Sequence, residues 1–145
     1  MPKKNIFVFY IEDDENDIVR VRASLVNFDI ELATANFDDA LAKLNDLTEK
    51  LPDLILLDLA NDRTGSVVQA TDIIGALAKH QVFKQIPILC YSNKFISPGD
   101  FQNKELPYAP LGNCYQTSKR YMGQVLNHII RDILTHPTVP TRITP

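Results

Sequence analysis

Acidic, hydroxyl and cationic side chains follow four separate apolar runs of this sequence. Glu12 and Asp13 follow the first run, Asp58 follows LILL, Ser92 follows ILCY, and Lys119 comes after CYQTS. Carboxylates gathered in one place repel one another, and burial makes the repulsion worse. A cation would relieve it, and carboxylate oxygens are the ligands that Mg²⁺ prefers. An aspartate can also accept a phosphoryl group, whose charge a metal, a hydroxyl and a lysine would then stabilise.

The elements that must position these residues alternate between strand-like and helix-like periods. Five short runs are typical of strands, namely residues 6–11, 30–34, 54–59, 86–92 and 112–117. Strands separated by helices predict parallel βαβ units. We therefore expect an α/β fold of the flavodoxin type, with a doubly wound five-stranded parallel sheet. Pro98, Pro107 and Pro110 restrict the segment between the last two strands, so its fourth helix should be short or distorted.

In such sheets, sites form beyond the carboxyl ends of the strands, where the strand order reverses. Glu12, Asp13, Asp58, Ser92 and Lys119 would all fall at that edge. Asp53 precedes its strand and would lie at the opposite edge.

Simpler explanations remain open for single members of this set. Glu12 and Asp13 could complement the positive end of the first helix, and we expect Asp14–Asp17 to do only that. Asp58 could be a loop acid or an N-cap, although a carboxylate at the end of a buried strand needs a partner. The coincidence of four segments at one edge is more specific than any one of these residues.

Composition is that of an ordinary globular protein, with 45% hydrophobic residues and a net charge of −3 over 145 residues. We expect one domain over residues 1–134 and an extended proline-containing tail over 135–145. The charge offers no basis for binding nucleic acid, and no apolar run is long enough for a membrane span. Cys90 and Cys114 are expected to be buried free thiols, and the location is expected to be cytoplasmic.

Four stretches resemble receiver domains of two-component response regulators, of the stand-alone, CheY-like type. They are FYIEDDEND, PDLILLDL, IPILCYSN and NCYQTS, and the resemblance spans about residues 5–134. It implies that Asp58 is the phosphoacceptor and that Ser92 is the hydroxyl at the site. It further implies a Mg²⁺ ion held by the carboxylates of Glu12, Asp13 and Asp58 and the backbone carbonyl of Ala60.

The last strand carries both a switch residue and a departure from the family pattern. The resemblance implies that Tyr115 is the switch aromatic, together with Ser92. The family places a lysine three residues after this aromatic, and that position is Ser118 here. Lys119 is one residue late, so either a local bulge delivers it to the site or the lysine is lost. Further departures are ANDRTG after the phosphoacceptor, with Asp62 where proline is expected, and the proline-rich segment near the fourth helix.

The resemblance implies a regulator that takes a phosphoryl group from a sensor histidine kinase or a phosphotransfer protein. It would signal to a downstream protein through segment 94–134 and would not be an enzyme beyond slow autodephosphorylation. The alternative is a phosphorylation-independent pseudo-receiver that serves as a binding scaffold. A phosphatase of the haloacid-dehalogenase type is disfavoured, because it needs a second aspartate where Ala60 stands.

Overall fold

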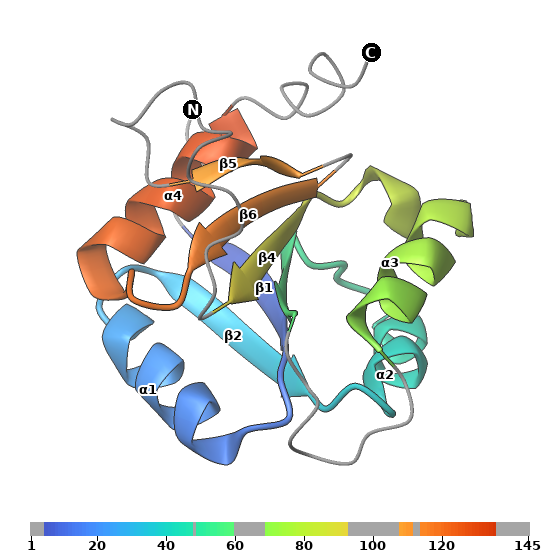
Figure 1. Cartoon of the computed structure of the whole chain (residues 1–145), viewed down its shortest axis with the longest axis horizontal. Helices are drawn as coiled ribbons and strands as arrows, with labels where there is room; N and C mark the ends of the chain where they lie inside the picture. Colours follow the sequence, from blue (N-terminus) through green and yellow to red (C-terminus); the bar gives the residue numbers. More distant parts are fainter. Residues whose placement is uncertain (1–4, 48, 60–68, 93–107, 112–113, 136–145) are drawn as a thin grey trace.

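The computed structural model describes residues 5–47, 49–59, 69–92, 108–111 and 114–135 of the chain (Figure 1). A central sheet lies between two pairs of helices, with α1 and α4 on one face and α2 and α3 on the other. The elements are β1 (Ile6–Ile11), α1 (Glu15–Leu25), β2 (Ile30–Ala35), α2 (Ala40–Asp46), β3 (Leu54–Asp58), α3 (Ala70–Lys79), a 3₁₀ turn (Phe83–Gln85), β4 (Ile88–Ser92), β5 (Tyr108–Leu111), β6 (Cys114–Ser118) and α4 (Gly123–Thr135).

The sheet order is β2-β1-β3-β4-β6-β5, and all neighbours are parallel except β5 and β6. The five predicted parallel strands are confirmed. The prediction was incomplete, however, because β5 adds a sixth, antiparallel strand at the edge. Pro110 lies within it, and an edge strand tolerates proline because one side of its backbone needs no ladder bond. The predicted short fourth helix falls in residues 97–106, outside the described part.

Each face of the sheet buries its own apolar cluster. The face under α2 and α3 is built from Phe9, Ile11, Ile55, Leu57 and Cys90, with Ala40, Leu44, Ala70, Ile73 and Leu77 from the helices. The face under α1 and α4 is built from Val8, Tyr10, Leu56, Tyr91 and Tyr115, with Val21, Leu25, Leu126, Ile129 and Ile130. Successive strand residues point to opposite faces, which explains why neighbours in sequence belong to different clusters.

Two helix starts depend on short polar side chains. Asp14 is the N-cap of α1, and its carboxylate accepts bonds from the amides of Asn16 and Asp17. Asn36 precedes the second helix, and its Oδ1 accepts from Asp39 N at 2.7 Å and closes a turn. The helix α2 therefore begins only at Ala40.

Cys90 and Cys114 are buried and unbridged, as expected. Among the described residues, none of the helices is long and apolar enough to cross a membrane.

Candidate functional site at the carboxyl edge of the sheet

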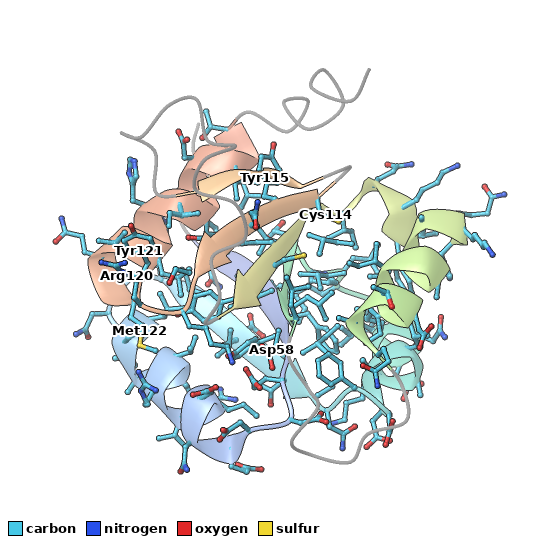
Figure 2. All side chains as sticks on the ribbon, viewed as in Figure 1. Asp58, Cys114, Tyr115, Arg120, Tyr121 and Met122 are labelled. Atoms are coloured by element: carbon cyan, nitrogen blue, oxygen red, sulfur yellow. The ribbon has the colours of Figure 1, made fainter. Side chains whose placement is uncertain are left out.

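The strand order places the candidate site at the carboxyl ends of β1 and β3. The chain runs from β1 outward to β2 and then returns to β3 on the other side, so the order reverses at this pair. Glu12 and Asp13 follow β1, and Asp58 ends β3, so all three stand at this switch point. Figure 2 shows Asp58, the last residue of β3, between the two helical layers. Both Glu12 and Asp58 are only 2% exposed.

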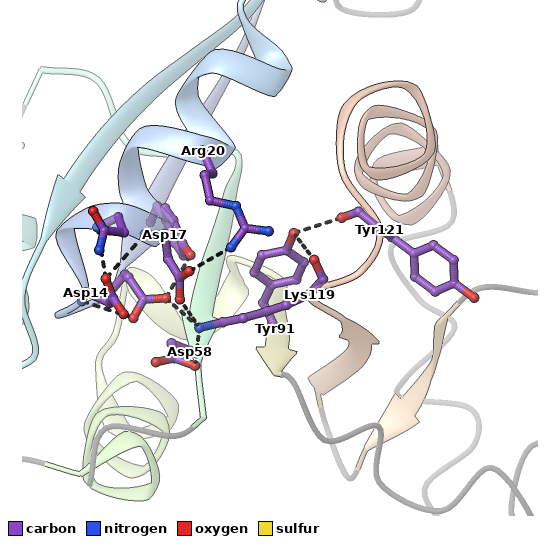
Figure 3. A network of polar contacts seen from close by, with 10 residues as sticks. Asp14, Asp17, Arg20, Asp58, Tyr91, Lys119 and Tyr121 are labelled. Carbon is purple, nitrogen blue, oxygen red and sulfur yellow. Dashed lines mark hydrogen bonds and ion pairs between the residues drawn. The ribbon is translucent and has the colours of Figure 1, made fainter. Parts of the chain in front are cut away.

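Lys119 reaches this edge although it comes one residue later than the family pattern. Its Nζ lies 3.1 Å from Asp58 Oδ1, 2.9 Å from Glu12 Oε1 and 2.8 Å from Asp17 Oδ2 (Figure 3). The alternation of β6 accounts for this, because Lys119 is an even number of residues from Tyr115 and continues its face of the sheet. Ser118 belongs to the other set of alternating positions. No extra residue in the ladder is needed, since Ser118 pairs in register with Ser92.

Glu12 is held in place by protein donors on both of its oxygens. Its Oε1 accepts from Tyr10 Oη at 2.8 Å and from Lys119 Nζ, and its Oε2 accepts from Asp14 N at 3.2 Å. A buried carboxylate is tolerable only when it is paired and hydrogen-bonded. Glu12 thus orients Lys119, and Tyr10 orients Glu12.

Asp17 is also a member of the site, although it was expected only to complement the positive end of the first helix. Its carboxylate accepts from Lys119 and is also paired with Arg20 at 3.3 Å, and its side chain is 13% exposed. The earlier interpretation was wrong for Asp17 because α1 turns this residue inward toward the sheet. It was sound for Asp14, which is the N-cap.

The cluster carries more negative than positive charge. Three carboxylates, from Glu12, Asp17 and Asp58, surround the ammonium of Lys119, and the guanidinium of Arg20 reaches only Asp17. Burial, followed by the adjacent Glu12, raises the pKa of Asp58 to about 7, although Lys119 opposes this shift. Burial alone would lower the pKa of Lys119, but its bonds to Asp17 and Glu12 and the charge of Asp58 hold that pKa above its usual value. The site therefore has an unmet demand for positive charge, which a proton or a cation can supply.

Asp13, the other acid of the pair after β1, lies toward the β2–α2 connection. Its Oδ1 accepts from Phe37 N at 2.7 Å. The donors Glu12, Asp13 and Asp58 are hard oxygen ligands of the kind that suits Mg²⁺. Within the described ranges, however, no group of three or more acids, histidines or cysteines is arranged to hold a metal ion. In this arrangement the cation among the acids is the Lys119 ammonium.

The structure describes some of the remaining predicted residues and not others. Tyr115 is buried in β6 among the residues under α1 and α4, and it pairs with Leu89 of the neighbouring strand β4. Ser92 is the last residue of β4, but its side chain lies outside the described part. Ala60 also lies outside it. Asp53 lies at the opposite edge of the sheet from Asp58, as predicted, and its Oδ2 accepts from Phe7 N at 2.8 Å.

Comparison with known proteins gives likenesses in structure only. No family model and no curated protein matches the sequence. The phosphorylated cyanobacterial phytochrome response regulator RcpA is similar at a TM-score of 0.59 and 21% identity, with 92% of this chain and 91% of that chain covered. The bacteriophytochrome response regulator AtBRR is similar at a TM-score of 0.65 and 16% identity, covering 91% and 93%.

A third solved structure is the Mn²⁺-bound form of the response regulator Rcp1, similar at a TM-score of 0.58 and 19% identity, covering 88% and 91%. The alignments with these three structures cover 88% to 92% of this chain and 91% to 93% of the other chains. This protein has the fold of a receiver domain. The CheY-like architecture predicted from the sequence is confirmed.

Proposed function

We propose that this receiver-fold chain is a response regulator that accepts a phosphoryl group on Asp58. The observation that supports it most is the position of Asp58, buried at the end of β3 with its Oδ1 3.1 Å from the Lys119 ammonium. A phosphohistidine of a sensor kinase or a phosphotransfer protein would be the donor. An oxygen of ionised Asp58 would attack phosphorus, the P–N bond would break, and the imidazole would leave with a proton.

The residues around Asp58 have distinct tasks in this step. Lys119 would stabilise the negative charge on the phosphoryl oxygens, which is worth most in a site that excludes water. Glu12 and Asp17 hold Lys119 in reach of Asp58. Ser92 is assigned the hydroxyl role by the resemblance, and Tyr115 the role of following it when the site is charged.

Mg²⁺ belongs to this proposal, with Glu12, Asp13, Asp58 and the backbone carbonyl of Ala60 as its ligands. The excess of negative charge around Lys119 supports a cation requirement. The similar regulator Rcp1 binds Mn²⁺, and the similar regulator RcpA is phosphorylated. When bound, the metal would neutralise charge on the incoming phosphoryl group.

Signalling would proceed by protein–protein contact in the cytoplasm, through the surface of segment 94–134. Of this segment the structure describes residues 108–111 and 114–134. The new charge on Asp58 would shift a two-state equilibrium of this surface and so change its affinity for a downstream protein. Turnover would be limited to slow autodephosphorylation.

A phosphorylation-independent scaffold is the second candidate. It is favoured by the three protein donors that already bond to Glu12. It is also favoured because, among the described residues, no three acids, histidines or cysteines are arranged to hold a metal ion. In that case Lys119 would serve as a permanent structural cation and the surface would hold a constant partner.

The two functions differ in one measurement. The chain is incubated with acetyl phosphate and Mg²⁺, and intact-protein mass spectrometry records the addition of a phosphoryl group. The wild type is expected to show it, Asp58→Asn to lack it, and removal of Mg²⁺ by a chelator to abolish it. The matched control is Asp53→Asn, which changes the aspartate at the other end of the same strand and should be phosphorylated like the wild type.

Two outcomes would count against the regulator. One is a wild type that acquires no phosphoryl group at any Mg²⁺ concentration, and the other is a phosphoryl group that persists in Asp58→Asn. The first result would leave the scaffold as the better account, and the second would show that a residue other than Asp58 accepts the phosphoryl group.

A further inference from the structure

Lys119 stands in a turn rather than in a strand, so its position depends on what holds that turn. β6 ends at Ser118, and the chain reverses over the next residues before α4 begins at Gly123. Tyr121 N donates to Ser118 O at 3.1 Å, and Arg120 N donates to Ser118 Oγ at 3.2 Å. These two bonds are local, and neither ties the turn to the rest of the sheet.

One side chain of the sheet does reach this turn. Tyr91 is fully buried in β4, and its hydroxyl lies 2.8 Å from Tyr121 O and 3.2 Å from Lys119 O (Figure 3). A phenol has a single proton to donate, so the hydroxyl serves the two carbonyls as a shared bridge. The bridge spans the residue that carries the ammonium and the residue two positions later.

The ring of Tyr91 is itself fixed by the sheet. It packs edge-to-face against Tyr10 at a centroid distance of 6.2 Å, within the cluster under α1 and α4. Burial raises the pKa of Tyr91 well above its ordinary value, so its hydroxyl keeps its proton and stays a donor. Tyr10 and Tyr91 therefore support the same ammonium from two directions, through the carboxylate of Glu12 and through the backbone of Lys119.

We propose that Tyr91 is a positioning residue that holds the β6–α4 turn so that Lys119 stays within reach of Asp58. The inference deepens the proposed function and rests on it where catalysis is concerned. An apolar side chain at this position would fill the same space but would leave the carbonyls of buried Lys119 and half-buried Tyr121 without their shared donor. The turn would then shift, and the ammonium would leave the three carboxylates for part of the time.

The variant that tests this is Tyr91→Phe, which keeps the ring and removes the hydroxyl. Its matched control is Tyr121→Phe, because the ring of Tyr121 points away from the Lys119 ammonium and only its carbonyl is part of the bridge (Figure 3). The first measurement is the reactivity of each lysine toward acetic anhydride, read by peptide mass spectrometry. Lys119 is expected to react about fivefold to tenfold faster in Tyr91→Phe and at the wild-type rate in Tyr121→Phe.

Hydrogen exchange separates a local effect from a general loss of stability. In Tyr91→Phe, exchange is expected to speed up in peptides covering residues 118–123, while β1 and β3 keep their protection. Loss of protection throughout the sheet would overturn the proposal, because Tyr91 would then act as a packing residue. Unchanged Lys119 reactivity would overturn it as well.

The rate of phosphorylation by acetyl phosphate tests the link to catalysis, because a purely structural role of Tyr91 would leave this rate unchanged. The rate at saturating donor is expected to fall about tenfold in Tyr91→Phe, with little change in the donor concentration at half-maximal rate. An unchanged rate together with increased Lys119 reactivity would refute the link to catalysis. If the wild type itself acquires no phosphoryl group, the proposed function fails, while the labelling and exchange results still decide whether Tyr91 positions Lys119.

Discussion

The two faces of the sheet differ in the side chains that they bury. The face under α2 and α3 is lined by apolar side chains, such as Phe9, Ile55 and Leu57. The face under α1 and α4 contains three fully or almost fully buried tyrosines, Tyr10, Tyr91 and Tyr115. Both faces stabilise the fold by burial, and among the described residues the hydroxyls of Tyr10 and Tyr91 on the second face continue the packing into hydrogen bonds at the carboxyl edge.

Alternation along the strands explains why the charged residues belong to the tyrosine face. Asp58 follows Leu54 and Leu56 at alternate positions, and Lys119 follows Tyr115 and Thr117 in the same way. The site is thus an extension of one face beyond the strand ends. We infer that substitutions under α2 and α3 should change stability alone, and that substitutions under α1 and α4 should change the site as well.

The largest effect on stability is expected from Ile55→Ala on the apolar face. Ile55 is fully buried, and truncating a buried isoleucine to alanine costs about 3 kcal/mol of unfolding free energy. Denaturant titration measures this loss, and acetic anhydride labelling measures Lys119 in the same samples. If Ile55→Ala made Lys119 reactive while still folded, the inference that this face affects stability alone would be wrong.

A pH-dependent effect is expected from Asp58→Asn. Because the pKa of Asp58 is raised from 3.8 to about 7 in the folded chain, the folded state binds more protons than the unfolded state between these values. This group therefore lowers the free energy of unfolding as pH rises through that window. Asparagine removes the effect, so the variant should be more stable than the wild type at pH 8, by on the order of 2 kcal/mol, and about equal to it at pH 4.

Thermal and denaturant unfolding at both pH values measure this difference. Asp53→Asn is again the matched control, because it makes the same chemical change at the opposite edge of the sheet. An Asp58→Asn variant less stable than the wild type at pH 8 would mean that the Lys119 pair outweighs burial and the charge of Glu12.

The smallest effect is expected from Tyr10→Phe, which removes one donor from Glu12. The loss of this bond should cost about 1 kcal/mol and should leave the main chain of the β6–α4 turn in place. Hydrogen exchange near residues 118–123 should accordingly stay at the wild-type level, in contrast to Tyr91→Phe. Equal exchange in the two variants would show that the tyrosines act as one packed unit instead of through separate bonds.

Much of the fold, and of the site at the carboxyl ends of the strands, could be predicted from particular residues of the sequence. Apolar runs with β-branched and aromatic residues marked β1, β3 and β4, and parallel strands bring their carboxyl ends to one edge. That placed Glu12 and Asp58 together. The position of Lys119 was left open because it was counted from a family spacing. The alternation from Tyr115 is a signal in the sequence that favours Lys119 over Ser118.

Other features had weaker signals or depended on the assembled structure. Asp17 looked like a helix-start acid because it lies in the first turn of α1, although its spacing of four residues from the buried Val21 places it on the inward side of the helix. β5 was missed because Pro107 and Pro110 argued against regular structure. Gly112 and Asn113, the two residues between Leu111 and its partner Cys114, are typical of a tight hairpin connection and were the available hint. Tyr91 gave no sign of its bridge, since a tyrosine in an apolar run reads as core.

The sixth strand has a consequence for the solution behaviour of the chain. Without β5, the parallel strand β6 would present an open row of backbone donors and acceptors, to which a strand of another molecule could add. β5 occupies that row with four residues, and it is itself a poor template because Pro110 has no amide hydrogen. We therefore expect this edge of the sheet to resist aggregation through strand addition, and replacement of Pro110 by valine to weaken that protection.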